Sequence, residues 1–428
     1  MEQMTYEELR ILAGKIEALD PDAVEAAKKR QESLAKPPGS LGMLEDISVR
    51  MAGITGRVIN EIKQGCVVIM CADNGVVSEN VASCPQTVTM AQTVNFTRRA
   101  TGVGALAESF GSELLIVDVG VKHPIPEELY DDTPLANTHK IVNRRLRAGT
   151  DDLAKGPAMS RQEALRCIAV GLEMADAVKA AGFDIIGTGE MGIGNTTTSA
   201  AVLSAVTGKD SHMTCGRGAG LTDEGYEAKC RIVDEASAKY RARGGLLEMM
   251  KRKEAEPEMI GRCCPQKLSD PEGDGKPGRT GKADASRDPG DLGDSASIMI
   301  DILSEMGGFD ICAMAGVFIG AAANRMPVVI DGYISAVAAV AAYIIAPVSR
   351  EYMFASHRSH EKGYAHAVDI LGLRPFMSLD MRLGEGSGCP IAFDIIRGAC
   401  DVMKNMATFE EAEIDDGYLE EIRRGDCF

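Results

Sequence analysis

Hydrophobic residues along this chain fall into two alternating patterns. Short continuous apolar runs are typical of strands in a parallel sheet, and longer segments with apolar residues at helical spacing predict helices. The runs predicted as strands are 66–71, 114–119, 140–143, 183–186 and 328–331, and the later segments predicted as helices are 161–181, 200–206, 225–240, 297–306, 315–323, 334–345 and 391–406. Because the two alternate, we predict an α/β fold with a mostly parallel, doubly wound sheet and helices on both faces.

The first 62 residues are helical in pattern. Residues 6–18, 22–34 and 41–62 are predicted as helices, and Lys36-Pro37-Pro38-Gly39-Ser40 interrupts them. Paired prolines hold the backbone extended, and Ser40 is suited to cap the helix that follows. This stiff segment is either a linker or an arm that carries Lys36 to a neighbouring site.

One later stretch lacks both patterns. Residues 252–295 consist largely of glycine, proline and charged residues, with few apolar side chains to offset the entropy of ordering. We predict a polar, disordered surface insertion there. Its role stays open, as does that of the adjacent Cys263 and Cys264 within it.

The stretch from Gly187 to Ser199 follows a predicted strand and leads into a predicted helix. Its four glycines are expected to allow positive φ and close approach of a ligand. The first N–H groups of the helix and the hydroxyls of Thr196, Thr197 and Thr198 would donate hydrogen bonds to an anion. The pattern therefore predicts a phosphate site, unless the glycines serve only tight packing of helix and strand.

Two familiar nucleotide sites fit this stretch poorly. A dinucleotide site needs an acidic residue about 20 positions on, and Asp210 there is in a polar segment rather than at a strand end. A triphosphate site needs a lysine where Asn195 stands. A monophosphate is the better prediction. Glu190 places a carboxylate among groups that would donate hydrogen bonds to a phosphate. Burying that charge costs free energy, so its presence favours a functional role for Glu190.

A second glycine-rich turn carries another carboxylate. Glu385 lies between Gly384 and Gly386, just before the predicted helix 391–406. Flanking glycines allow close approach and leave no adjacent side chain to pair with the carboxylate, so an apolar pocket would raise its basicity. Glu385 is therefore either a general base or a solvent-facing carboxylate at the start of a helix.

The net charge makes nucleic acids and membranes poor candidate partners. Lys plus Arg number 46 and Asp plus Glu 63, which gives a formal net charge of −17, and no basic tract occurs. The most apolar segment, 334–346, is shorter than the roughly 20 residues that span a bilayer, and residues 1–20 are mixed in charge and amphipathic, unlike the basic start and apolar middle of a signal peptide. We expect a cytoplasmic protein. The 12 cysteines form no metal-ligand cluster, so neither a metal nor a cofactor is predicted.

The candidate residues restrict the chemistry. His357 and His360 lie in a polar segment that predicts the surface, and no Ser-His pair or metal cluster is evident. Phosphate hydrolysis usually needs a metal, and glycosidases need two carboxylates in opposed roles. Displacement of a pyridinium from C1′ of a ribose monophosphate needs only a base, because the pyridine ring leaves without a proton.

Seven segments, in one order over nearly the whole chain except 252–295, closely resemble a known family. They are 36–42, 72–77, 85–89, 189–197, 216–221, 329–332 and 382–388. The family is that of the nicotinate-nucleotide-dimethylbenzimidazole phosphoribosyltransferases. The resemblance implies transfer of phosphoribose from nicotinate mononucleotide to a cobamide lower-ligand base, with inversion at C1′ to give an α-ribotide and nicotinate.

The resemblance also implies the fold and the roles of particular residues. It implies a Rossmann-like core over 65–371 and a small helical domain built from 1–64 and 372–428, in a dimer with sites near the interface. Glu385 resembles the general base, and Glu190 would line the same site. The phosphate and ribose would be held by Gly192, Gly194, Asn195, Thr196, Lys229 and Ser359, and the base would be bordered by Ser83, Cys84, Pro85, Gln86 and Leu383.

Two departures from the family leave the acceptor open. At the positions of Asn74 and Cys84 in this chain, the family usually has a histidine and an aromatic residue, respectively. Without an aromatic ring at position 84, the base pocket has less surface for stacking. Dimethylbenzimidazole, another benzimidazole, a purine such as adenine and a phenol all remain candidates. A heterodimer with a paralogue, in which this chain is a catalytically weak partner subunit, is the main alternative. A nicotinamide-dependent oxidoreductase ranks behind it.

Overall fold

The computed structural model describes residues 4–252 and 294–419, and its centre is one six-stranded sheet. All neighbouring strands are parallel, in the order β3-β2-β1-β4-β5-β6. The strands are β1 (Gly65–Ala72), β2 (Glu113–Gly120), β3 (Ile141–Asn143), β4 (Ile185–Met191), β5 (Val328–Ile330) and β6 (Met353–Ala355). This is the strand order of the Rossmann fold, so the predicted α/β class is confirmed.

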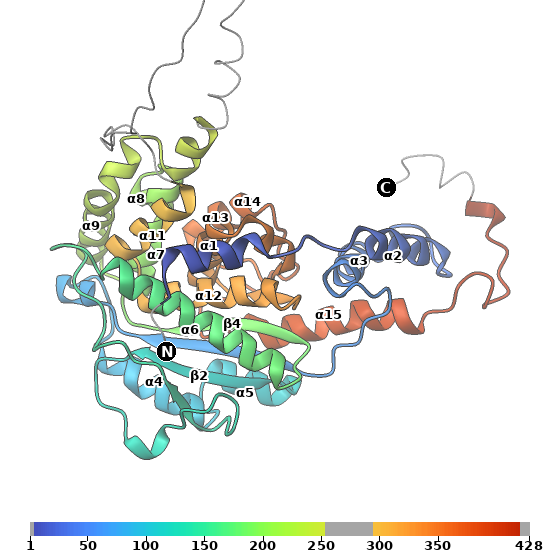
Figure 1. The fold of residues 1–428 in the computed structure, drawn as a ribbon, viewed down its shortest axis with the longest axis horizontal. Helices are drawn as coiled ribbons and strands as arrows, with labels where there is room; N and C mark the ends of the chain where they lie inside the picture. The colour runs from blue at the N-terminus through green and yellow to red at the C-terminus, as the bar shows by residue number, and fades with distance from the viewer. Residues whose placement is uncertain (1–3, 253–293, 420–428) are drawn as a thin grey trace, which may run out of the picture.

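Helices cover both faces of the sheet (Figure 1). One face carries α12 (Phe309–Ala323) and α13 (Tyr333–Ile345), with α6 (Arg161–Ala180) packed on α12. The other face carries α4 (Thr87–Thr97), α5 (Gly102–Phe110) and the first part of α15 (Gly388–Asn405). Strands β1 and β4 are the central pair, at which the order of the strands reverses, and both are buried along nearly their whole length.

Several further helices flank this core. They are α7 (Asn195–Thr207), α8 (Ser211–Thr214), α9 (Asp223–Arg241), α11 (Ser295–Met306) and α14 (Lys362–Leu371). The periodicity did not predict α5, α14 or the short strand β6. Helix α7 begins at Asn195 rather than at Ala200, and β4 runs on to Met191. The glycine-rich stretch is therefore mostly regular structure with a short turn between.

The N-terminal helices divide between two places. Helix α1 (Tyr6–Gly14) packs on α12, whereas α2 (Pro21–Ser33) and α3 (Met43–Thr55) lie beside the far end of α15 (Figure 1). Helix α3 ends seven residues before the predicted Ile62, because Gly56 takes a left-handed conformation, with φ 71°, and ends it. The domain boundaries proposed from the sequence stay a prediction.

The stiff Lys36 segment belongs to this helical part. The Lys36 ammonium lies 2.8 Å from the Glu45 carboxylate, and both side chains are largely buried. Lys36 is thus paired within its own unit in this chain. The predicted insertion lies outside the described residues except at its ends. No helix among the described residues has the length and apolarity needed to cross a membrane.

Candidate active site

Three of the four glycines between 187 and 194 serve close packing rather than a left-handed turn. Gly187 and Gly189 lie within β4, and a Cβ at Gly189 would lie 2.4 Å from the carbonyl oxygen of Glu385. A Cβ at Gly192 would lie 2.3 Å from the last carbonyl oxygen of β1. Of the four, only Gly194 has a positive φ, of 95°. The expectation of positive φ is therefore wrong for three glycines, which instead allow close contact with the chain's own atoms, and close approach of a ligand stays a prediction.

The start of α7 offers hydrogen-bond donors at one end of the site. The N–H groups of Gly194 and Thr196 have no acceptor within the described part of the chain. Lys229 is fully buried, and its Nζ donates to Thr196 Oγ1 at 2.9 Å and to the Gly216 carbonyl oxygen at 3.0 Å. Burial lowers the pKa of Lys229, and an arriving phosphate would favour its charged form. Free amides and a buried ammonium at a helix N-terminus fit a phosphate.

Two of the three threonine hydroxyls expected to donate to the anion do not line the cavity. The Thr198 hydroxyl donates to the carbonyl oxygen of Asn195 at 3.0 Å. The Thr197 hydroxyl is buried, and no partner for it lies among the described residues. Only Thr196 of the three faces the cavity, because a helix turns successive side chains to different faces.

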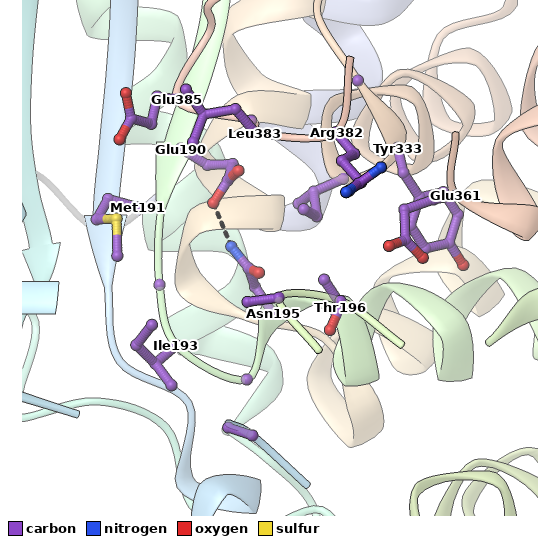
Figure 2. A pocket seen from close by; sticks show the side chains of 18 of the residues that line it. Glu190, Met191, Ile193, Asn195, Thr196, Tyr333, Glu361, Arg382, Leu383 and Glu385 are labelled. Carbon is purple, nitrogen blue, oxygen red and sulfur yellow. Dashed lines mark hydrogen bonds between the residues drawn. The ribbon is translucent and has the colours of Figure 1, made fainter. Parts of the chain in front are cut away.

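Glu190 belongs to a buried group of polar side chains. Figure 2 shows the Asn195 amide pointing at the Glu190 carboxylate, to which it donates a hydrogen bond. The same Nδ2 donates to Asp310 Oδ2 at 3.2 Å. Burial and the charge of Asp310 raise the pKa of Glu190 to about 8, and burial raises that of Asp310 to about 7. Both carboxyl groups therefore have pKa values well above those of exposed carboxylates.

Glu385 is buried, 5% exposed, which excludes the solvent-facing alternative. Its Oε1 accepts a hydrogen bond from Gln92 Nε2 at 3.2 Å, and its Oε2 accepts one from the Val103 N–H at 3.2 Å. Burial nevertheless raises the pKa of Glu385. The adjacent residues are glycines and supply no side-chain partner, but α4 brings Gln92 to Glu385 from a distant part of the sequence. Two neighbouring carboxylates in different surroundings are suited to different roles.

One cavity of about 700 Å³ brings most of the predicted residues together. Its wall includes Glu190 and Glu385, the proposed phosphate-side residues Gly192, Gly194, Asn195, Thr196 and Ser359, and the proposed base-side residues Ser83, Cys84 and Leu383. Pro85, Gln86 and Lys229 are outside this wall. Gln86 donates to the Asn74 carbonyl oxygen at 2.9 Å and accepts from Lys122 at 3.0 Å.

The cavity wall also contains residues that the sequence did not single out. Among them are Gln92, Arg217, Asp331, Tyr333, Glu361 and Arg382, and Figure 2 shows Arg382, Tyr333 and Glu361 together at the end away from Glu385. His357, predicted on the surface, is 2% exposed and lines the cavity. Asp331 carried a usable signal, since it directly follows β5 and such positions meet at one edge of the sheet. No described group of three or more His, Cys, Asp or Glu is arranged to hold a metal ion.

Comparisons with known proteins agree with this architecture. A family model described as phosphoribosyltransferase matches residues 16–253 and 281–414. The nicotinate-nucleotide-dimethylbenzimidazole phosphoribosyltransferase of Clostridium perfringens is 43% identical over 418 residues, which is 98% of each chain. That of Clostridium tetani is 38% identical over 410 residues, or 96% of each. Among solved structures, the crystal structure of CobT from Thermus thermophilus matches this fold with a TM-score of 0.75 and 32% sequence identity. The match covers 93% of this chain and 100% of the CobT chain. The chain belongs to this phosphoribosyltransferase family.

Proposed function

We propose that this chain transfers the 5-phosphoribosyl group of nicotinate mononucleotide to a cobamide lower-ligand base, releasing nicotinate. The observation that carries the proposal is one cavity with a phosphate-binding end at α7 and a buried carboxylate, Glu385, facing the same space. Family membership supports the reaction class, and the names of the relatives support this donor and acceptor. No cofactor is part of the proposal.

The chemistry follows from these two ends. The phosphate would lie at the start of α7, near Thr196, Lys229 and Ser359, and this would fix C1′ within the cavity. The acceptor nitrogen, or the hydroxyl oxygen of a phenol, attacks C1′ from the face opposite the pyridinium, the glycosidic bond breaks, and the bonding electrons return to the pyridine ring. The configuration inverts. Glu385 takes the proton that the acceptor loses, so charge and protons balance.

The acceptor is proposed as a class rather than as one compound. Ser83, Cys84 and Leu383 would contact it, and Pro85 and Gln86 would shape the segment that carries Cys84. The Cys84 side chain is smaller than a ring and leaves room in the pocket. A benzimidazole, a purine or a phenol is therefore proposed.

The assembly and location are also proposals. Leu383, on the cavity wall, is 59% exposed and Leu379 is 55% exposed, so this edge offers apolar surface to a second subunit. We propose a dimer, either of this chain or with a paralogue, in the cytoplasm. Light scattering of the purified chain tests the homodimer.

A product assay tests the function. The purified chain is incubated with nicotinate mononucleotide and dimethylbenzimidazole, benzimidazole, adenine or phenol, and nicotinate and ribotide are separated by chromatography. We expect acceptor-dependent nicotinate release, lost in Glu385→Gln and retained in Glu173→Gln, whose carboxylate pairs with Arg144 on another part of the chain. Release that Glu385→Gln leaves unchanged would refute the base assignment. No release with any acceptor would favour the partner-subunit alternative.

A further inference from the structure

Asp331 is a buried carboxylate that binds the backbone of the Glu385 loop. It directly follows β5, lies just before α13 and is 2% exposed. Its Oδ1 accepts the N–H of Gly388 at 2.7 Å, and its Oδ2 accepts the N–H of Gly386 at 3.1 Å. Both oxygens thus hold the segment that immediately follows Glu385.

That segment needs to be held. Gly384, Glu385 and Gly386 have φ values of 85°, 64° and 87°, so three consecutive residues take the left-handed conformation. For Glu385, which carries a Cβ, this conformation is unfavourable and persists only where the surroundings impose it. The two N–H groups bonded to Asp331 are such a restraint, because they follow Glu385 by one and three residues.

Asp331 is itself fixed in place. Its own N–H donates to Ser335 Oγ at 3.1 Å in α13, and its carbonyl oxygen accepts from Ser356 Oγ at 3.0 Å, just after β6. The one described basic side chain near its carboxylate is His357, whose Nδ1 lies 3.9 Å from Oδ1. Burial lowers the pKa of His357 to about 4, so this imidazole is neutral and supplies no counter-charge. The backbone amides are therefore the main partners of the carboxylate.

We propose that Asp331 is a positioning residue that holds Glu385 in its left-handed conformation, with its carboxylate aimed into the cavity. The inference rests on the proposed function, in which Glu385 is the base. Asp331 would act through the N–H groups of Gly386 and Gly388 rather than on the substrate.

The test is Asp331→Asn, with Asp118→Asn as the matched control. An amide at position 331 keeps one acceptor oxygen but turns an NH₂ donor toward the second N–H group. Asp118 is equally buried, near the end of β2, where Oδ1 accepts the N–H groups of both Gly120 at 3.0 Å and Val121 at 2.8 Å, and Oδ2 accepts the Tyr130 hydroxyl at 2.7 Å. The control therefore makes the same substitution at a buried carboxylate away from the cavity wall, where the amide oxygen can keep both backbone N–H groups.

We expect kcat to fall about 100-fold in Asp331→Asn, the order of loss for an active-site group displaced by about 1 Å, with little change in KM for nicotinate mononucleotide. In the full chain, amide hydrogen exchange of residues 384–388 should become faster in Asp331→Asn and not in Asp118→Asn. Should Asp331→Asn fail to fold, Ser335→Ala, which loosens Asp331 through its N–H, should give a smaller change in the same direction.

A double-mutant cycle separates positioning from direct action. If Asp331 acts through Glu385, adding Asp331→Asn to Glu385→Gln should lower the residual rate little further. Full additivity, unchanged exchange at 384–388, or a rise in KM without a change in exchange would overturn the inference. Full activity of Glu385→Gln alone would instead refute the proposed base, whatever the exchange data show.

Discussion

Gly189→Ala places a methyl group between β4 and the Glu385 loop. The new Cβ would lie 2.4 Å from the Glu385 carbonyl oxygen, 2.8 Å from its carbonyl carbon and 2.9 Å from the Gly386 nitrogen. All three are backbone atoms, so no side-chain rotation relieves the overlap. Strand β4 is held on both sides by β1 and β5, so the loop is the element that must move.

The required movement sets the expected effect. An ordinary Cβ contact begins near 3.4 Å, so the loop must retreat by about 1 Å. A shift of that size at a catalytic group lowers the rate on the order of 100-fold, and overpacking costs about 1–3 kcal/mol of folding free energy. We therefore expect a folded, moderately destabilised enzyme with a large loss of kcat.

The assay is nicotinate release at saturating donor, with urea unfolding measured in parallel. Gly320→Ala is the control, since its Cβ would lie 2.7 Å from the Ala175 Cβ between α12 and α6, at the end of α12 away from Asp310. It should lose comparable stability and keep its rate. Wild-type kcat in folded Gly189→Ala, or an equal rate loss in Gly320→Ala, would refute the reasoning.

Three further predictions concern pH and substrate binding. Gln92→Leu removes a hydrogen bond that lowers the pKa of Glu385, so the acid limb of the pH profile of kcat/KM should move to higher pH. The control, Gln86→Leu, should leave the acid limb where it is in the wild type. Coincident pH profiles for Gln92→Leu and the wild type would contradict the prediction. Lys229→Met removes the buried ammonium and should raise KM for nicotinate mononucleotide about 10- to 100-fold. The change in kcat should be smaller, in contrast to Gly189→Ala, which should mainly lower kcat. Steady-state kinetics check this prediction, and an unchanged KM would count against a phosphate at the start of α7. Asp310 has a folded-state pKa of about 7, above the ordinary 3.8, so its stabilising contribution is present at low pH and is lost as pH rises through about 7. The free energy of unfolding from urea titrations should therefore fall less between about pH 5 and about pH 8 in Asp310→Asn than in wild type, and equal falls would show that Asp310 is not the titrating group.

Much of the fold follows from local sequence. The runs at 66–71 and 114–119 are apolar throughout or nearly so, as expected of strands buried on both faces, and both lie within strands of the central sheet. Short elements escaped this reasoning. Strand β6 was not predicted from the sequence, and its three residues Met353–Ala355 pair in parallel with β5 in the structure.

The site divides along the same line. Glycine-rich stretches that lead into helices, each with one carboxylate, identified Glu190 and Glu385, and only the stretch with Glu190 also follows a predicted strand. Whether a glycine is needed for a positive φ or for a close contact depends on what packs against it. For Gly187 and Gly189 the sequence predicts a positive φ, whereas the structure shows close contacts instead.

Protonation and restraint at the site are properties of the tertiary structure alone. Asp310, Asp331 and Gln92 come from three separate segments, and each acts on a carboxylate or loop far away in sequence. Burial, which raises the pKa of Glu190 to about 8, exists only once the helices close over the sheet. The sequence by itself determined which residue types reach the sheet edge. Folding decided which carboxylates have raised pKa values and how Glu385 is held, because both depend on distances between atoms that the chain brings together only in three dimensions.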